Sequence, residues 1–160
     1  HDYLQLFEGS PEFDKVQRFA ARVYDLSQYL DEILQVNYED KGEKIKVAWH
    51  SNCHALRVAK SVEASKNLIR KFANVELLEL EHEEECCGFG GTFAVKESDI
   101  SNAMALAKIE DIKKTGASYL ISGDGGCLLN ISGTMKRNGV DIKCLHLYDF
   151  LIKRLEGAPL

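Results

Sequence analysis

Hydrophobic residues in the first part of the chain recur at intervals of three and four, which is the spacing of one helix face. The pattern runs over residues 13–34 and follows Ser10-Pro11-Glu12, a typical helix start with a capping hydroxyl and an early proline. It predicts an amphipathic helix, or two helices joined by a bend, that reaches to about Val36. Asp40-Lys41-Gly42 then ends the helical pattern.

Beyond residue 43 the pattern changes to short apolar runs that alternate with helical segments. Alternation of strands and helices predicts a parallel sheet, because a crossover helix returns the chain to the same end of the sheet. We therefore expect a three-layer α/β fold in which a parallel sheet of about four strands carries helices on both faces. The predicted strands are 44–49, 75–80, 118–122 and 140–145, and the predicted helices are 61–72, 98–114, 128–137 and 147–155.

Composition narrows the class of protein. The 160 residues are 45% hydrophobic and 28% charged, which is ordinary for a globular domain with its own core. The net charge of −5 and the lack of a basic block argue against nucleic acid as a partner. No apolar run has the roughly 20 residues of a membrane span. Because the sequence begins at His1 rather than Met, we expect a fragment or a processed product.

Cysteine is the residue type that points to chemistry. The five cysteines cannot all pair within one chain, and no export signal is present, so we expect free thiols and a cytoplasmic location. Four of them follow predicted strands: Cys53 the first, Cys86 and Cys87 the second, and Cys127 the third. The carboxyl ends of parallel strands meet at one edge of the sheet, so these four thiols are expected at one site. Cys144 lies inside a predicted strand, and we interpret it as a core residue.

The two adjacent cysteines open a glycine-rich loop. Neighbouring side chains of an extended chain point in opposite directions, so both thiols reach one site only if the backbone bends. Gly88, Gly90 and Gly91 permit that bend, because glycine tolerates positive φ. The arrangement predicts a thiolate-rich pocket for a soft metal or an iron–sulfur cluster.

Several interpretations of these thiols remain open. Zinc and iron–sulfur clusters both accept four thiolates, and the lack of a CxxC pair favours a multi-iron cluster. The alternatives are a zinc-binding structural or docking module without redox activity, and a thiol–disulfide switch at Cys86 and Cys87. A further alternative is that the cysteines have no chemical role, because a single free cysteine is often just a small buried apolar residue.

Histidines near these loops are candidates for a supporting role. Such a histidine more often caps a helix or holds a metal ligand in place than binds the metal itself. The strongest candidate for a direct ligand is His54, because it adjoins Cys53. Asp124 is a candidate metal ligand, but we expect it to cap the helix that begins near Cys127 or to form the turn before it. The histidines considered are His50, His54, His82 and His146.

Three stretches together resemble a known family. They are HSNCH at residues 50–54, CCGFGGTF at residues 86–93 and GDGGCL at residues 123–128. They resemble the cysteine-rich CCG domain that occurs in heterodisulfide reductases and in the iron–sulfur subunits of glycolate oxidases, and most of all the lactate-utilization branch. The likeness extends over nearly the whole chain. Such proteins usually carry two CCG-like halves, and this chain is similar to the C-terminal half with the helix before it.

The resemblance implies a fold and a function. It implies an N-terminal helical arm at residues 1–42 and a CCG-type α/β domain at residues 43–160. It implies an electron-transfer subunit with a 4Fe–4S type iron–sulfur cluster, an oxidoreductase component of a lactate or glycolate (2-hydroxy acid) oxidation system. The expected partners are the other subunits of that complex, with a homo-oligomer as a further option.

The resemblance also implies the residues that hold the cofactor. The cluster would be bound by Cys53, Cys86, Cys87 and Cys127, with Gly88, Gly90 and Gly91 letting the loop wrap around it. The fuller family pattern ends in CxxC, and Asp124 stands here in place of the first cysteine, as is common in the lactate-utilization branch. The match therefore implies four thiolates rather than five. An incomplete site finished by a substrate thiol or water, or a zinc site, is also compatible with it.

Overall fold

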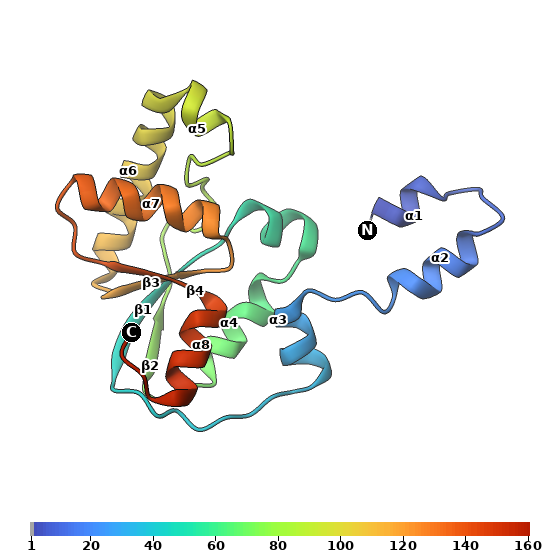
Figure 1. Cartoon of the computed structure of the whole chain (residues 1–160), viewed down its shortest axis with the longest axis horizontal. Helices are drawn as coiled ribbons and strands as arrows, with labels where there is room; N and C mark the ends of the chain where they lie inside the picture. Colours follow the sequence, from blue (N-terminus) through green and yellow to red (C-terminus); the bar gives the residue numbers. More distant parts are fainter. Residues whose placement is uncertain (1) are drawn as a thin grey trace.

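A parallel sheet forms the centre of the molecule (Figure 1). The computed structural model describes residues 2–160, and its four strands lie in the order β2-β1-β3-β4. Every neighbouring pair is parallel, with Ile45 opposite Val75 and His50 opposite Ser122. The predicted α/β class is therefore confirmed. The strands are β1 (Ile45–His50), β2 (Val75–Leu78), β3 (Tyr119–Ser122) and β4 (Lys143–His146).

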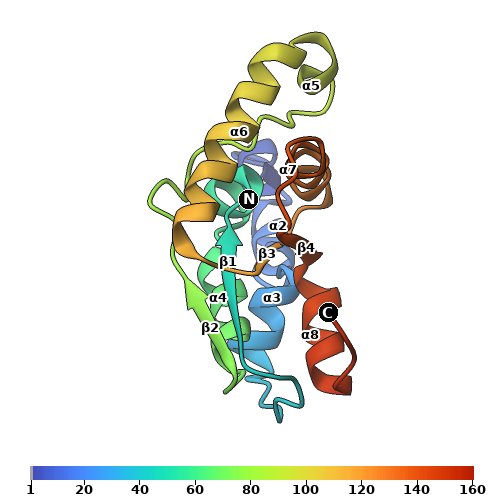
Figure 2. The ribbon, with the colours of Figure 1, turned by 90° about the vertical axis from the view of Figure 1, so that its left-hand side faces the viewer.

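Helices cover both faces of the sheet (Figure 2). Two helices pack on one face of the sheet, and they follow β2 and β3 in the chain. Two more helices pack on the opposite face, and they follow β1 and β4. These three layers agree with the prediction. On the first face lie α6 (Ser98–Thr115) and α7 (Gly125–Arg137), and on the second lie α4 (Val62–Arg70) and α8 (Leu147–Glu156).

The alternation of side chains along β1 and β3 explains the two cores. Ala48 and Leu120 point into the core under α6 and α7. Trp49 and Ile121, one residue further along each strand, point into the core under α4 and α8. Because successive side chains of a strand face opposite sides, Val47–Trp49 of β1 and Leu120–Ile121 of β3, which are buried on both faces, are consecutive apolar residues.

The amphipathic segment near the N-terminus divides into two helical parts, as the bend alternative predicted. α2 (Phe13–Ala20) ends well before α3 (Leu26–Gln28), which continues into the π-helical turn η1 (Tyr29–Ile33). Asp25 starts the second part: its side chain accepts a hydrogen bond from the Ser27 N–H at 3.0 Å and forms a capping box with Gln28. This local cap fixes a helix start inside the apolar repeat.

Other element limits differ from the prediction by a few residues. α7 begins at Gly125, three residues early, because Asp124 already caps it. β4 begins only at Lys143, where pairing with Tyr119 of β3 starts. Three short elements were not predicted, since they are too short to produce a periodic pattern: α1 (Asp2–Leu6), η2 (Ala55–Ala59) and α5 (Phe93–Lys96).

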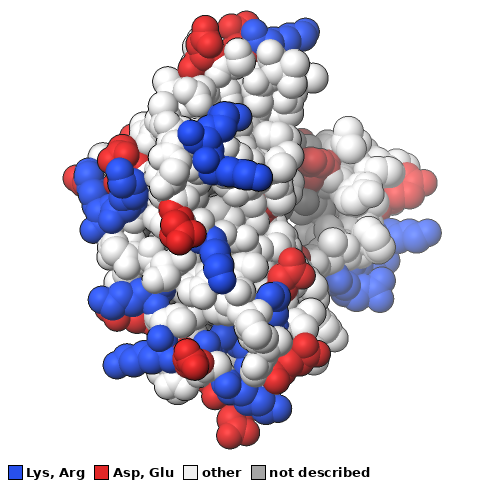
Figure 3. Space-filling view, turned by 60° about the vertical axis from the view of Figure 1, so that its left-hand side comes forward, with Lys and Arg blue, Asp and Glu red and all other residues white. Residues whose placement is uncertain are grey.

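The first two helices lie away from the sheet (Figure 1). Neither α1 nor α2 contains a buried residue, whereas Leu30 and Val36 already pack against the core under α4 and α8. The division of the chain at residue 42 stays a prediction. On the face seen in Figure 3, Lys and Arg side chains are interspersed with Asp and Glu. Within residues 2–160, no helix combines the length and the hydrophobicity that crossing a membrane requires.

Candidate metal centre

The candidate site lies at the carboxyl ends of β1 and β3. From β1 the chain crosses to β2 on one side, and β3 then lies on the other side of β1. Such a change of direction opens a crevice at the strand ends, where α/β proteins bind their ligands. His50 ends β1 and Ser122 ends β3. The Ser122 hydroxyl donates a hydrogen bond to the His50 carbonyl at 2.9 Å and fixes this junction.

Three ligand-type side chains meet at this crevice. His50, Cys87 and Cys127 each offer one ligand atom, and these atoms all lie within 4.8 Å of one another. The residues come from the end of β1, from the loop after β2 and from the first turn of α7. All three are buried, at 1%, 2% and 7% exposure. We call them the His50–Cys87–Cys127 cluster.

The imidazole of His50 lacks hydrogen-bond partners. Both ring nitrogens are buried, and neither makes a hydrogen bond within the described chain, residues 2–160. A buried polar group left in this state costs about 1–3 kcal/mol. Coordination of a metal, or a hydrogen bond to a thiolate that a metal holds, would satisfy a ring nitrogen. One imidazole and two thiols form a donor set that suits zinc or another thiophilic metal.

The pKa values of the two cysteines in the cluster are shifted in opposite directions. A hydrogen bond from Cys127 and the nearby His50 ring lower the pKa of Cys87 to about 4, although burial acts in the opposite direction. The hydrogen bond to Cys87, burial and the negative charge of Cys87 raise the pKa of Cys127. The negative charge of the pair is therefore favoured on Cys87 rather than on Cys127. A metal cation bound there would favour loss of the second proton as well.

The glycine-rich loop bends as predicted. Gly88, Gly90 and Gly91 all have positive φ, at +82°, +50° and +61°. At Gly88 a side chain is also excluded by packing, because a Cβ atom would lie 2.5 Å from the carbonyl oxygen of Ser101. The loop therefore passes close against α6, and only glycine fits there.

The other two predicted thiolate ligands lie outside the cluster. Cys53 and Cys86 are exposed, and neither belongs to the group of ligand atoms within 4.8 Å. Cys86 opens onto a surface groove beside Met104, while Cys53 precedes η2. The structure thus brings together two of the four cysteines, and the four-thiolate set stays a prediction. Cys144 packs against the core as expected, and burial raises its pKa to about 11.

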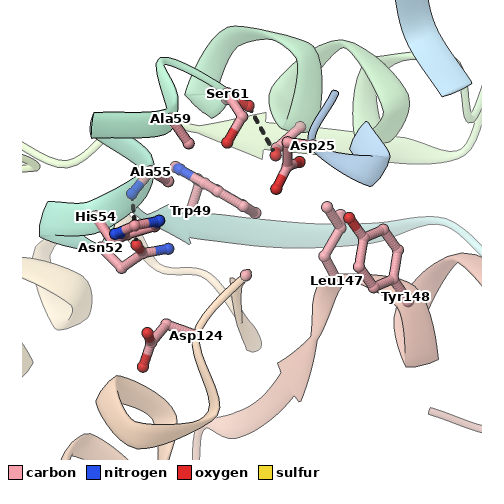
Figure 4. Close-up of a pocket in the computed structure, with 12 residues that line it drawn as sticks. Asp25, Trp49, Asn52, His54, Ala55, Ala59, Ser61, Asp124, Leu147 and Tyr148 are labelled. Atoms are coloured by element: carbon pink, nitrogen blue, oxygen red, sulfur yellow. Dashed lines mark hydrogen bonds between the residues drawn. The ribbon is translucent and has the colours of Figure 1, made fainter. Parts of the chain in front are cut away.

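The predicted cap by Asp124 is confirmed, one histidine also caps a helix, and one preference among the histidines changes. Asp124 accepts a hydrogen bond from the Cys127 N–H at 2.9 Å, and His146 caps α8 through Tyr148. His54, the strongest of the histidine candidates for a direct ligand, instead lines a neighbouring cavity (Figure 4). His50 takes its place in the cluster. The alternation of β1 could have indicated this, because it puts His50 on the side of Ala48, where the thiol loop lies.

The neighbouring cavity has a volume of about 100 Å³ and is walled by Trp49, Asn52, His54 and Tyr148, among others (Figure 4). Its polar groups are largely engaged. Asn52 Oδ1 accepts a hydrogen bond from the Ala55 N–H at 2.8 Å, drawn as a dashed line in Figure 4. This bond holds the start of the segment after β1 in place at the cavity wall.

The capping role of Asp124 leads to a prediction. We expect Asp124→Ala to lower the free energy of unfolding by about 1 kcal/mol, because an N-cap is lost, and to leave the metal content unchanged. Denaturant unfolding and elemental analysis measure the two effects. Asp124→Asn is the matched control, since asparagine also caps helices. Loss of metal from both folded variants would instead identify Asp124 as a ligand.

Comparison with known proteins places the chain in a family. The CCG cysteine-rich domain matches residues 47–132. Proteins named lactate utilization protein A are similar over most of the chain: 36% identical over 98% of it in Oceanobacillus iheyensis and 40% identical over 94% in Shouchella clausii. The chain spans 65% and 63% of the length of these two relatives. The matched residues include both cysteines of the buried cluster, and the chain belongs to the CCG cysteine-rich domain family.

Proposed function

We propose that the chain is the iron–sulfur-binding, electron-transferring part of a lactate-oxidising system. The observation that carries this proposal is the His50–Cys87–Cys127 cluster, a buried thiol site with an unpartnered imidazole at the ligand-binding edge of the sheet. The relatives that are named for lactate utilization support the choice of substrate. Glycolate, another 2-hydroxy acid, is the alternative substrate. The partners in this proposal are the other subunits of that oxidation system.

Each residue has a role in this proposal. Cys87 and Cys127 would hold the cofactor from the buried side, while Cys53 and Cys86 would complete the thiolate set at the exposed rim. Gly88, Gly90 and Gly91 would let the loop follow the cofactor closely. An iron–sulfur cluster supplies one-electron transfer when bound, at a potential set by burial and by hydrogen bonds to its sulfurs. All five cysteines are free, which is consistent with a reducing cytoplasm.

The second candidate is a zinc site with a structural role. It is favoured by one observation: the compact cluster supplies one nitrogen and two sulfur ligands without any contribution from Cys53 or Cys86. Three protein ligands of this kind suit a tetrahedral zinc ion whose fourth position is filled by another group.

Metal analysis separates the two candidates. We expect protein purified without oxygen to contain iron and inorganic sulfide in matching amounts, with the broad visible absorption of a thiolate-bound cluster. Stoichiometric zinc that persists after attempted cluster reconstitution would support the zinc site and reject electron transfer. Protein that binds neither metal under either condition would contradict both candidates.

A further inference from the structure

The glycine-rich loop at residues 86–91, which we call the thiol loop, packs directly on the first turns of α7. Phe89 follows Cys87 by two residues, and its ring lies so close to Gly126 that a Cβ atom at Gly126 would collide with it. Gly126 in turn precedes Cys127. The loop that carries one cysteine of the cluster and the helix that carries the other are therefore in contact beside both thiols.

A hydrogen bond joins the same two segments on the other side of Cys127. Asn130 follows Cys127 by three residues, nearly one helical turn along α7. Its Nδ2 donates a hydrogen bond to the carbonyl oxygen of Cys87 at 2.9 Å. The same Nδ2 donates to the hydroxyl of Ser101 on α6 at 3.3 Å, and Ser101 is buried. Asn130 thus connects the thiol loop with two helices at once.

This bond acts on the relative position of two atoms that would hold a metal. Its acceptor belongs to Cys87 itself, and its donor belongs to the helix of Cys127. The ligand atoms of Cys87, Cys127 and His50 lie within 4.8 Å of one another. A binding site needs its groups held to within about 0.5 Å, and a loop reaches such precision less readily than a helix does. A loop rich in glycine therefore depends on outside contacts of this kind.

The helix itself gives no reason for an asparagine at this position. Asparagine is a weak helix former, because its side chain competes with the backbone for hydrogen bonds. Asn130 nevertheless lies inside α7, and both acceptors of its Nδ2 belong to other segments. Its hydrogen bonds thus serve the junction between these segments.

We propose that Asn130 is a positioning residue for the metal centre. Through its hydrogen bond to the Cys87 carbonyl, it keeps the thiol loop in register with α7, so that the sulfurs of Cys87 and Cys127 face the same metal ion or cluster. This inference rests on the proposed metal-binding function and adds to it a residue that acts through the backbone of a ligand.

Two substitutions at Asn130 test this role. Asn130→Asp keeps the shape of the side chain but cannot donate to the Cys87 carbonyl, and Asn130→Leu removes the amide without adding a charge. We expect both to weaken Zn²⁺ binding about 10- to 100-fold, the usual effect of removing a group that holds a metal ligand in place. We also expect faster alkylation of Cys87 in the metal-free protein, because this buried thiol is then less firmly held.

Asn138 provides the matched control, with the same two substitutions. It lies at the other end of α7, and its Nδ2 donates to the Thr134 carbonyl at 2.8 Å. Its variants therefore lose the same kind of hydrogen bond without affecting the thiol loop. We expect their Zn²⁺ affinity and the alkylation of Cys87 to stay unchanged.

The experiment uses the whole chain purified without oxygen. Competition with a coloured chelator gives the Zn²⁺ affinity, and denaturant unfolding gives the stability of the metal-free protein. Alkylation followed by peptide mass spectrometry gives the reaction rate of each cysteine. Cys144 serves as the internal reference, because it packs against the core and a general loosening of the fold would raise its rate as well.

The outcomes are distinct. Weaker Zn²⁺ binding and faster alkylation of Cys87 in the Asn130 variants, with Cys144 and the Asn138 variants unchanged, would support the inference. Unchanged affinity in both Asn130 variants would overturn it while leaving the proposed function intact. An equal loss of affinity in the Asn138 variants, or an equal gain in the rate of Cys144, would indicate a general effect on folding and would also overturn it. If the original protein binds neither Zn²⁺ nor a reconstituted cluster, the proposed function itself fails.

Discussion

Cys87→Ser is expected to abolish metal or cluster binding while the fold persists. The Cys87 sulfur is one of three ligand atoms that lie within 4.8 Å of one another, and it is the sulfur of the buried pair whose pKa is lowered. Serine has nearly the same shape, but its hydroxyl is a poor ligand for a soft metal. The loss of metal affinity should exceed the roughly 10- to 100-fold effect of replacing a residue that only holds a metal ligand in place. Metal content and far-ultraviolet circular dichroism measure binding and fold.

Variants of the other cysteines complete this test. Cys127→Ser is expected to match Cys87→Ser, whereas Cys144→Ser should keep the full metal content, since Cys144 lies in β4 against the core. Full occupancy in Cys87→Ser would refute the assignment of the cluster as the metal site. Cys53→Ser and Cys86→Ser distinguish the two candidate functions: both lose the cofactor if four thiolates hold it, and both keep it if the compact cluster binds zinc.

The fold was predictable where local rules determine it. β1 is apolar and buried over Val47–Trp49 because both faces are covered there, so pattern alone identifies it as a central strand. Asp124 caps α7 through a contact three residues away, which a short motif can encode. The break before α3 was less certain, because the apolar spacing continues through residues 21–25 while the capping box of Asp25 begins a new helix.

The site was predictable only in part, because its geometry depends on contacts between distant segments. The loop order indicated that Cys87 and Cys127 would meet. The alternation of β1 puts His50 on the side of Ala48, but the approach of the loop after β2 and of α7 to that side is a contact between distant segments. Cys53 is exposed just before the π-helical turn η2, whose C-terminal residue Lys60 has a φ of +57° without a glycine to signal it.

His50 provides the second large prediction, in which stability and binding change in opposite directions. We expect His50→Leu to raise the free energy of unfolding of the metal-free protein by about 1–3 kcal/mol, because two buried ring nitrogens without partners are replaced by an apolar group of similar size. If the imidazole binds the metal directly, the same substitution should lower Zn²⁺ affinity by more than about 100-fold. That is the upper end of the effect of replacing a residue that only holds a metal ligand in place. Denaturant unfolding and chelator competition measure the two quantities.

His54→Leu is the control for a neighbouring histidine, because His54 lines the adjacent cavity and lies outside the cluster. It should change neither quantity appreciably. Retained affinity in His50→Leu, or a less stable metal-free protein, would mean that the imidazole serves packing rather than binding. A gain of stability together with a loss of affinity would mean that His50 destabilises the metal-free fold and that metal binding offsets this effect. Such a trade distinguishes a binding residue from a core residue, because substitution of a core histidine would lower the stability of the metal-free protein.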